Sequence, residues 1–251
     1  MNLPLLFAHR GANSFGPENS LSAFAKAIEM GCDGIELDVR ITADDKLVVF
    51  HDRNTLRMTG FRGSIQRMTF NKLRELRLGG EGFSPEKIPS LAELLDLAGK
   101  KLLINLDIKK ERFSGSHFEQ KIVALLNDFG LQENTVISSF NPFVLKRISS
   151  LNPALHLGYI YSNRSSLMML NGHPVESLHV RYRLLSRRYL QHLQQRGLKV
   201  YAWTVDRLEA MQKLLEKGID GIITNRPEYF LEMIKTRQDL KDHLNSNRGR
   251  D

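Results

Sequence analysis

The stretch MGCDGIEL, residues 30–37, decides how this chain folds. It ends a helical pattern at a glycine, turns through Asp-Gly and then begins a buried, apolar strand. Glycine after a helix removes the steric cost of the left-handed residue that ends it. A similar stretch, KGIDGIIT, occupies residues 217–224 near the other end of the chain. The two stretches form a weak internal repeat of one helix-to-strand unit.

Outward from this unit, short β-branched runs alternate with helical patterns along nearly the whole chain. The expected strands are 5–9, 34–40, 47–51, 102–108, 135–140, 156–161, 176–181, 199–204 and 221–224. The expected helices are 19–30, 90–98, 116–129, 142–150, 186–196, 207–217 and 228–240. Asn19 and Ser90 are the expected N-caps of two of these helices, and Glu93 completes a capping-box pattern with Ser90. Seven helices with eight core strands favour a closed (β/α)8 TIM barrel over an open doubly wound sheet.

Two stretches interrupt this alternation. Residues 52–89 are too long for a loop between a strand and a helix, and they contain the short helical pattern MTFNKLRELRL. They are predicted to form a small inserted subdomain after the second strand region. The chain ends in a polar tail from about residue 241. With both stretches included, the 251 residues have the usual length of one barrel, so 1–251 is predicted to be a single domain.

Composition and charge limit the classes of protein that the chain can belong to. Its 41% hydrophobic and 25% charged residues are ordinary for a globular protein. The apolar runs are too short to span a bilayer, and the start MNLPLLFAHRG lacks the pattern of a signal peptide. The single cysteine, Cys32, excludes an intrachain disulfide. The sequence therefore predicts a cytoplasmic protein without stable membrane insertion.

The formal net charge of +8 raises the local concentration of anionic partners such as phosphate esters, nucleic acid or anionic lipid heads, but a solvated basic surface without any partner agrees with it equally well. No basic strip with interleaved aromatic residues suggests a nucleic-acid groove, so a small-molecule partner is expected and nucleic acid is not. The sequence leaves the oligomeric state open.

Carboxylates on two expected strands indicate a metal site. In GIELDVR, residues 34–40, the side chains of Glu36 and Asp38 project from the same face of the strand. In LLINLDIKK, residues 102–110, Asp107 shares a face with Asn105 and Lys109. An ion pair between Asp107 and Lys109 at the rim is the alternative. Three carboxylates with amide and water oxygens suit Mg²⁺, Ca²⁺ or Mn²⁺ rather than zinc.

Two histidines supply candidate acid–base groups. His9 closes the first expected strand, and His51 closes the strand predicted over 47–51. Two histidines at the carboxyl ends of adjacent strands, beside three carboxylates, could act as general base and general acid in one turnover. Arg10 follows His9 directly, and its planar guanidinium suits recognition of a phosphate.

The motifs that contain these residues resemble those of the glycerophosphodiester phosphodiesterase family. The similar motifs are HRG at 9–11, PENS at 17–20, ELD at 36–38, HD at 51–52, DIK at 107–109, ISSFNP at 137–142, WTV at 203–205 and DGIITNRP at 220–227. They cover essentially the whole chain in the family's order, with an insertion after the His-Asp pair where the family has one. Singly these motifs are weak, but as an ordered set they are specific.

The resemblance implies a (β/α)8 barrel that hydrolyses glycerophosphodiesters to glycerol 3-phosphate and an alcohol. One divalent cation, Mg²⁺ or Ca²⁺ with Mn²⁺ also possible, would be held by Glu36, Asp38 and Asp107. His9 and His51 would be the acid–base pair. Arg10, Lys109, Trp203 and Glu18 would contact the substrate. Glu18 could instead only support the first loop, and Trp203 could instead belong to ordinary core packing.

Two positions depart from the family's pattern. Asp107 stands where the family usually has glutamate, which is one methylene longer. The last motif usually reads T-D-x-P, and here Asn225 replaces the aspartate, which removes a carboxylate that is expected to have a structural role.

Two other functions stay open. One is the same chemistry on lysophospholipids, as in lysophospholipase D or sphingomyelinase D relatives, for which Phe61, Phe70 and Phe83 of the insertion could supply apolar surface. The other is a non-catalytic protein that binds phosphate esters. The sequence also leaves open the leaving alcohol, the identity of the ion, the assignment of base and acid, and the choice between direct water attack and a cyclic phosphate.

Overall fold

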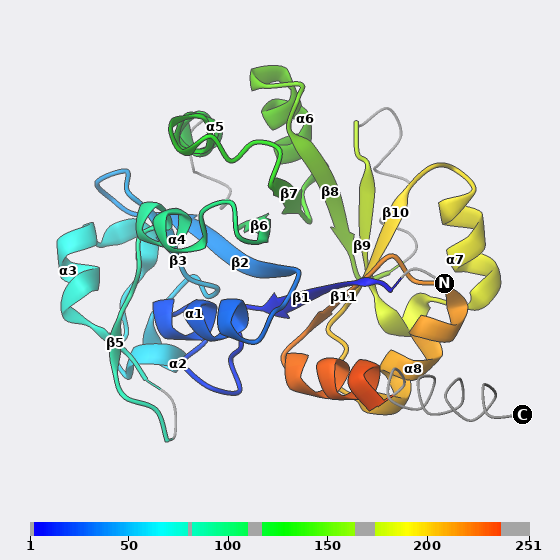
Figure 1. Cartoon of the computed structure of the whole chain (residues 1–251). Helices are drawn as coiled ribbons and strands as arrows, with labels where there is room; N and C mark the ends of the chain where they lie inside the picture. The colour runs from blue at the N-terminus through cyan, green and yellow to red at the C-terminus, as the bar shows by residue number, and fades with distance from the viewer. Residues whose placement is uncertain (1–2, 80–81, 110–116, 164–173, 237–251) are drawn as a thin grey trace, which may run out of the picture.

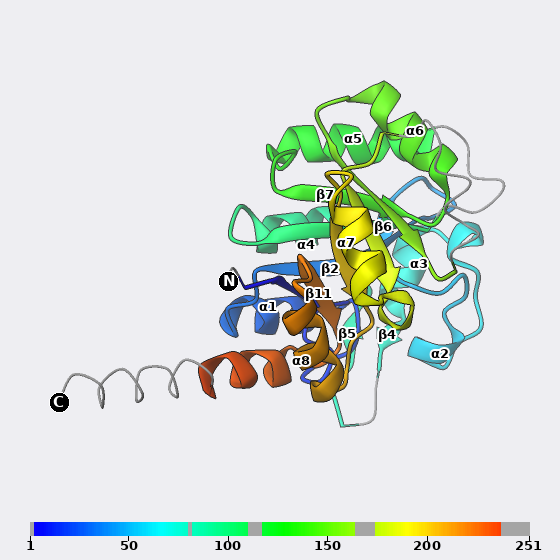
Figure 2. The same cartoon turned by 90° about the vertical axis from the view of Figure 1, so that its right-hand side faces the viewer.

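The computed structural model describes residues 3–79, 82–109, 117–163 and 174–236. Its centre is a ring of eight parallel strands, with helices around the outside (Figures 1 and 2). In ring order the strands are β1 (Leu5–His9), β2 (Gly34–Ile41), β6 (Leu103–Ile108), β7 (Thr135–Ser139), β8 (His156–Tyr161), β9 (Ser177–Arg181), β10 (Lys199–Trp203) and β11 (Gly221–Thr224). Because β11 pairs with β1, the ring is closed, and the predicted (β/α)8 barrel is confirmed.

The helices follow the predicted order. They are α1 (Leu21–Glu29), α4 (Leu91–Ala98), α5 (His117–Phe129), α6 (Pro142–Leu151), α7 (Arg187–Gln194) and α8 (Leu208–Lys217), and residues 227–236 are also helical. Their apolar faces pack against the outer faces of the strands in one large core. The expected tail from about 241 and the end of the helix predicted over 228–240 lie outside the described residues.

The two predicted helix caps have different outcomes. Ser90 caps α4, and its reciprocal capping box with Glu93 is present. The prediction for Asn19 is wrong, because Ser20 is the N-cap of α1 and accepts a hydrogen bond from the backbone N–H of Ala23. The side chain of Asn19 instead donates to the carboxylate of Asp38, 2.9 Å away inside the barrel.

The repeat seen in the sequence has a structural counterpart. Gly31 and Gly218 end their helices in the left-handed conformation, with φ of 77° and 80°. The aspartate two residues further on then ties its own strand to the preceding one. Asp33 Oδ2 accepts from Leu6 N on β1, and Asp220 Oδ2 accepts from Val200 N on β10, each at 2.8 Å. Both contacts lie at the amino ends of the barrel strands.

The expected strand over 47–51 is shorter than predicted and is not part of the ring. β3 (Leu47–Val49) pairs antiparallel with β2, so His51 does not close a parallel barrel strand. The antiparallel return still brings His51 to the barrel mouth, because the backbone N–H of Phe50 donates to Asp38 O at 2.9 Å. The guanidinium of Arg40 holds the carbonyl oxygen of His51.

The chain between β3 and α4 carries several short elements. They are α2 (Leu56–Thr59), a 3-10 helix (Ile65–Arg67), α3 (Phe70–Glu75), β4 (Arg77–Leu78) and β5 (Glu86–Lys87), the last two of which pair with each other. A small apolar cluster of Val48, Phe50, Ile65, Leu73, Leu78 and Ile88 lies beneath them. The interpretation of residues 52–89 as an inserted subdomain of a single-domain chain stays a prediction.

The barrel interior is filled with aromatic and polar side chains. Gly158 leaves room for His179, because a Cβ at residue 158 would lie 2.5 Å from Nε2 of that ring. His179 is in turn within 3.2 Å of Ser177 Oγ and 3.4 Å of Asn105 Nδ2. This packed interior forms the floor beneath the carboxyl ends of the strands. Within the described residues, no helix is both long and apolar enough to cross a membrane.

Candidate active site

Three carboxylates converge at the carboxyl ends of β2 and β6. Glu36, Asp38 and Asp107 each offer an oxygen within 4.8 Å of the others, and all three side chains are buried. Asp38 and Asp107 are partners in the register between the two strands. Burial and the neighbouring Asp38 and Asp107 carboxylates raise the pKa of Glu36 well above its usual range. Such mutual repulsion is relieved when a cation neutralises the group.

These residues fit a divalent ion. Asp107 Oδ1 is buried and, among the described residues, has no hydrogen-bond partner. A buried carboxylate oxygen in that state is costly unless a cation or a donor reaches it. Carboxylate oxygens are also the ligands that hard divalent cations prefer. The three predicted ligands therefore form one candidate cation site.

Two basic side chains lie against this cluster. Lys109 Nζ is 3.1 Å from Asp38 Oδ1 and forms a closer ion pair with Asp107. Arg10 Nε lies 3.2 Å from Asp38 Oδ2. Burial disfavours the charged lysine, but Asp107, Asp38 and Glu36 outweigh it and raise the pKa of Lys109. The ion pair considered for Asp107 and Lys109 is thus present, and it lies within the carboxylate cluster.

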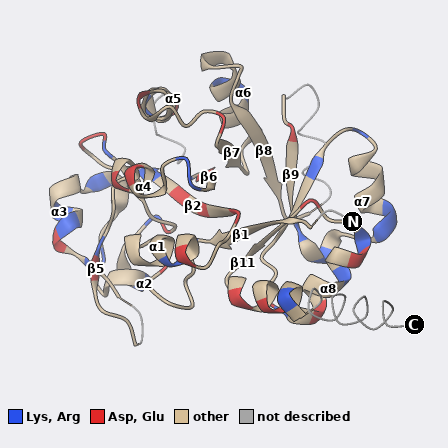
Figure 3. Cartoon of the chain, in the orientation of Figure 1, with Lys and Arg blue, Asp and Glu red and all other residues tan. Residues whose placement is uncertain are grey.

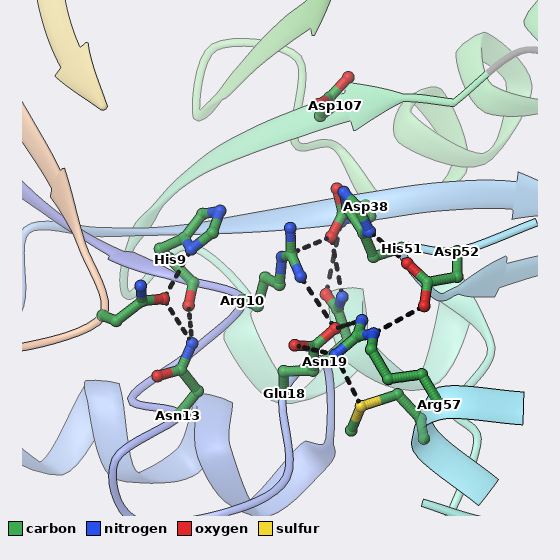
Figure 4. Close-up of polar contacts among 12 residues, drawn as sticks. His9, Arg10, Asn13, Glu18, Asn19, Asp38, His51, Asp52, Arg57 and Asp107 are labelled. Carbon is green, nitrogen blue, oxygen red and sulfur yellow. Dashed lines mark hydrogen bonds and ion pairs between the residues drawn. The ribbon is translucent and has the colours of Figure 1, made fainter. Parts of the chain in front are cut away.

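Arg10 adopts an uncommon backbone conformation. Its φ is 58°, in the left-handed region that costs a non-glycine residue about 1–2 kcal/mol. Two backbone hydrogen bonds hold it there: Arg10 N donates to Glu36 O at 2.8 Å, and Asn19 N donates to Arg10 O at 2.9 Å. The turn directs the guanidinium of Arg10 toward Asp38 and Glu18 (Figure 4).

His9 is held by a neutral amide. Asn225 Nδ2 donates to Asp206 Oδ2 at 2.8 Å, so Asn225 Oδ1 faces His9 Nδ1, 2.7 Å away. An amide oxygen only accepts, so Nδ1 carries the proton and Nε2 keeps its lone pair. Asn13 Nδ2 donates to the same Oδ1 and to His9 O. Burial and then Arg10 lower the pKa of His9 to about 4, so the ring is neutral at pH 7.

His51 is held by a carboxylate. His51 Nδ1 donates to Asp52 Oδ1 at 2.7 Å, and Asp52 Oδ2 accepts from Arg57 Nε at 2.7 Å. Arg57 belongs to α2, and it also contacts both carboxylate oxygens of Glu18 (Figure 4). The two histidines therefore differ in the charge of the group that orients them.

A cavity of about 130 Å³ joins these groups. Seven of the nine predicted site residues line it: His9, Arg10, Glu36, His51, Asp107, Lys109 and Trp203. Trp203 Nε1 donates to His179 O at 2.9 Å, and its ring meets Phe140 edge-on. Asp38 contacts the cavity-lining side chains of Arg10 and Lys109. Glu18 lines a neighbouring cavity of about 710 Å³ with Arg57.

Sequence reasoning missed the residues that orient the histidines. Asp52 belongs to the His-Asp motif at 51–52, but no role was predicted for it. Asp206 directly follows the WTV motif. For Asn225, the only predicted consequence was the loss of a structural carboxylate, but its side chain contacts His9. Asn13 and Arg57 belong to no quoted motif. The available signal was an acid or amide within three residues of the end of a strand at the same mouth: Asn225 directly follows β11, and Asp206 lies three residues after β10.

Basic and acidic residues are both spread over the chain (Figure 3). The acids of the site stand apart because they are buried at the end of the barrel where enzymes of this fold place their catalytic groups. The fold and the site define a barrel enzyme with candidate acid–base groups beside a candidate cation site.

The chain belongs to the glycerophosphoryl diester phosphodiesterase family, whose model matches residues 9–229. It is 35% identical to a glycerophosphodiester phosphodiesterase of Caldanaerobacter subterraneus subsp. tengcongensis, over 92% of this chain and 98% of that one. It resembles the solved structure of an Oleispira antarctica phosphodiesterase in complex with the product sn-glycerol-3-phosphate, at 27% identity and TM-score 0.86, over 93% and 97% of the two chains. A glycerophosphodiester phosphodiesterase from Thermotoga maritima, also 27% identical, has a TM-score of 0.78 over 93% and 99%.

Proposed function

We propose that this enzyme hydrolyses glycerophosphodiesters to sn-glycerol 3-phosphate and an alcohol, with one bound divalent cation. The observation that carries the proposal is the pair of oriented histidines that line one small cavity beside the three carboxylates. The similar Oleispira antarctica phosphodiesterase was solved with sn-glycerol-3-phosphate as its product, which supports glycerol phosphate as one product here. Membership of an enzyme family sets aside the non-catalytic alternative.

The partners of the two histidines favour one assignment of roles. His9 Nδ1 is bound by the neutral amide of Asn225, which leaves the lone pair of Nε2 free to take a proton. His51 Nδ1 donates to the carboxylate of Asp52, which fixes the ring and leaves Nε2 to carry the proton that the leaving oxygen takes. His9 therefore acts as general base and His51 as general acid.

In this scheme an oxygen nucleophile forms a bond to phosphorus while the bond from phosphorus to the leaving alcohol breaks. His9 takes the proton of the nucleophile, and His51 gives a proton to the leaving oxygen. The nucleophile is either water or the neighbouring glycerol hydroxyl; in the second case a cyclic phosphate forms and water then opens it. Detection of the cyclic phosphate by ³¹P NMR during turnover distinguishes the two routes.

The charge that gathers on the phosphoryl oxygens needs positive groups. Arg10 and Lys109 line the cavity and supply two of them. A divalent cation held by Glu36, Asp38 and Asp107 would neutralise further charge at the same oxygens. The all-oxygen donor set supports Mg²⁺ or Ca²⁺, with Mn²⁺ as a further candidate.

The neighbouring cavity supports a polar leaving alcohol over an acyl chain. It shares His9 and Arg10 with the smaller cavity, and its walls include Asn13, Ser14 and Arg226. Among the residues that the structure describes, Phe83 is the one phenylalanine that lines it. Of the other two insertion phenylalanines, Phe70 packs on the small apolar cluster and Phe61 is exposed. Lysophospholipid hydrolysis is therefore the second choice.

The first experiment measures release of glycerol 3-phosphate from glycerophosphocholine with Mg²⁺, with Ca²⁺ and with EDTA. We expect turnover that depends on metal and that is lost in His9→Ala. Absence of turnover with glycerophosphocholine, glycerophosphoethanolamine and glycerophosphoglycerol would refute the proposal, and lysophosphatidylcholine is the substrate to test next. The cytoplasmic location stays a prediction, which fractionation of the native cells tests.

A further inference from the structure

Arg57 lies at the edge of the barrel mouth and contacts two acids that belong to different loops. Its Nε donates to Asp52 Oδ2 at 2.7 Å. Its Nη1 and Nη2 donate to Glu18 Oε2 at 3.0 Å and to Glu18 Oε1 at 2.6 Å. Arg57 comes from α2, in the segment between β3 and α4, whereas Glu18 comes from the loop between β1 and α1.

Each of these acids also binds a residue of the candidate active site. The second oxygen of Asp52 accepts from His51 Nδ1 at 2.7 Å. Glu18 Oε1 accepts from Arg10 Nη1 at 2.9 Å, at the same oxygen that Arg57 Nη2 binds. The contacts thus form a continuous chain from His51 through Asp52, Arg57 and Glu18 to Arg10 (Figure 4).

The charges in this chain alternate, so each carboxylate lies between two donors. A carboxylate bound on both sides cannot rotate without the loss of one charge-assisted hydrogen bond. Without Arg57, Asp52 is free to turn and His51 loses a fixed orientation. Glu18 is then free to bind Arg10 with both oxygens, which competes with a phosphate for the same guanidinium.

The geometry requires an arginine. Its planar fork reaches Asp52 through Nε and Glu18 through the two terminal nitrogens at once, which the single ammonium of lysine cannot do. The side chain is 48% exposed, so its replacement leaves no large cavity in the core. These two properties make the function of Arg57 separable from the stability of the fold.

We propose that Arg57 is a positioning residue, which orients His51 through Asp52 and restrains Arg10 through Glu18. This inference rests on the proposed function, in which His51 protonates the leaving oxygen and Arg10 binds the phosphoryl group. It assigns to the segment between β3 and α4 a direct part in aligning the reaction.

The test compares two substrates that differ in their need for an acid: glycerophosphocholine, with a poor alkoxide leaving group, and glycerol 3-(p-nitrophenyl phosphate), whose leaving group departs without protonation. We expect Arg57→Lys and Arg57→Gln to lower kcat for the choline ester by roughly 10- to 100-fold, the loss typical of a misplaced catalytic group. The loss for the nitrophenyl ester should be several times smaller. The matched control is Arg62→Gln, an exposed arginine of the same segment, which should leave both rates unchanged.

Equal losses on both substrates would overturn the part of the inference that assigns Arg57 to the orientation of His51, and wild-type rates in both Arg57 variants would overturn the inference as a whole. A double-mutant cycle with Asp52→Asn gives a second measurement: the two losses should be strongly non-additive if the residues act in one chain, and full additivity contradicts it. Failure of the proposed function is recognised separately, because the wild-type enzyme would then turn over neither ester. Thermal melting of each variant checks that it folds, and Arg57→Lys, which keeps the charge, decides the matter if Arg57→Gln does not.

Discussion

Asp38 and Asp107 are register partners on adjacent strands, and Lys109 forms an ion pair with both of them. A basic group therefore lies within the same cluster that is proposed to hold a divalent cation. The ammonium group of Lys109 neutralises part of the negative charge of the carboxylates, and Lys109 also lines the cavity where a phosphate would bind. Its neighbours include the ring of Phe140, 5.6 Å from Nζ. Ion and lysine together would balance the three carboxylates.

The first prediction concerns the third ligand. Asp107→Asn keeps the shape of the side chain but removes its charge, and we expect Mg²⁺ or Ca²⁺ to bind at least about 10-fold more weakly, since hard cations bind through anionic oxygens. Isothermal titration with each ion measures the change. Asp107→Glu is the matched control and should keep the ion bound. Unchanged affinity in Asp107→Asn would exclude this residue as a ligand.

The second prediction separates acid from base. His51→Ala should lose much less activity on glycerol 3-(p-nitrophenyl phosphate) than on glycerophosphocholine, because a good leaving group needs no general acid. His9→Ala should lose activity on both esters to a similar extent, by roughly 10²- to 10⁴-fold. Steady-state kinetics with the two esters give the comparison. The reverse pattern would exchange the two roles.

The third prediction concerns the side chains behind His9. Asp206→Asn replaces one of the two acceptor oxygens of Asp206 with a donor NH2 group. Because the backbone N–H of Asn225 binds the oxygen that remains, Nδ2 of Asn225 loses its acceptor, and the amide can turn and present Nδ2 to His9 Nδ1. We expect kcat to fall by roughly 10- to 100-fold on both phosphodiesters, by misplacement of the base. ¹⁵N NMR of the His9 ring should show protonated Nδ1 in the wild type and a changed tautomer in the variant. A single unchanged tautomer in both proteins would contradict this role of Asp206.

The fourth prediction concerns stability against pH. Burial lowers the pKa of His179 to about 3 from an ordinary value of 6.5. His179 therefore binds a proton below pH 6.5 in the unfolded chain, but only below about pH 3 in the folded chain. The stabilising effect is complete above pH 6.5 and is lost as the pH falls toward 3, by about 1.4 kcal/mol per pH unit.

Urea unfolding at pH 7, 6 and 5 measures this contribution, with His179→Gln as the reference. The free energy of unfolding of the wild type should fall more steeply with acidification than that of the variant. Parallel curves would show that His179 takes up a proton in the folded protein.

Much of the fold and site was predictable because it depends on local periodicity. The period of two along a strand places Glu36 and Asp38 on one face, and the order of strands around a barrel brings Asp107 beside them. The direction in which β3 pairs does not follow from periodicity, so His51 was placed at the end of the wrong kind of strand. Both Asn19 and Ser20 are residue types that cap helices. Because the side chain of Asn19 donates to the buried Asp38 carboxylate, Ser20 is the N-cap.

Contacts between segments that are distant along the chain could not be predicted from the sequence. His9 and Asn225 are 216 residues apart, and Glu18 and Arg57 are 39 apart. Nothing in the composition around Arg57 distinguishes it from the other arginines of its segment. Only the folded geometry shows which of them reaches two acids at once.

The paired contacts of Asp33 and Asp220 lie at the amino ends of the strands, and the cavity opens at their carboxyl ends. Each aspartate fastens two neighbouring strands without the help of any side chain near the reaction. A protein engineer could therefore exchange loops at the open mouth to alter substrate preference while the opposite end keeps the strands aligned. The amino ends of the strands thus hold the barrel together, while the loops at their carboxyl ends can change without loss of those contacts.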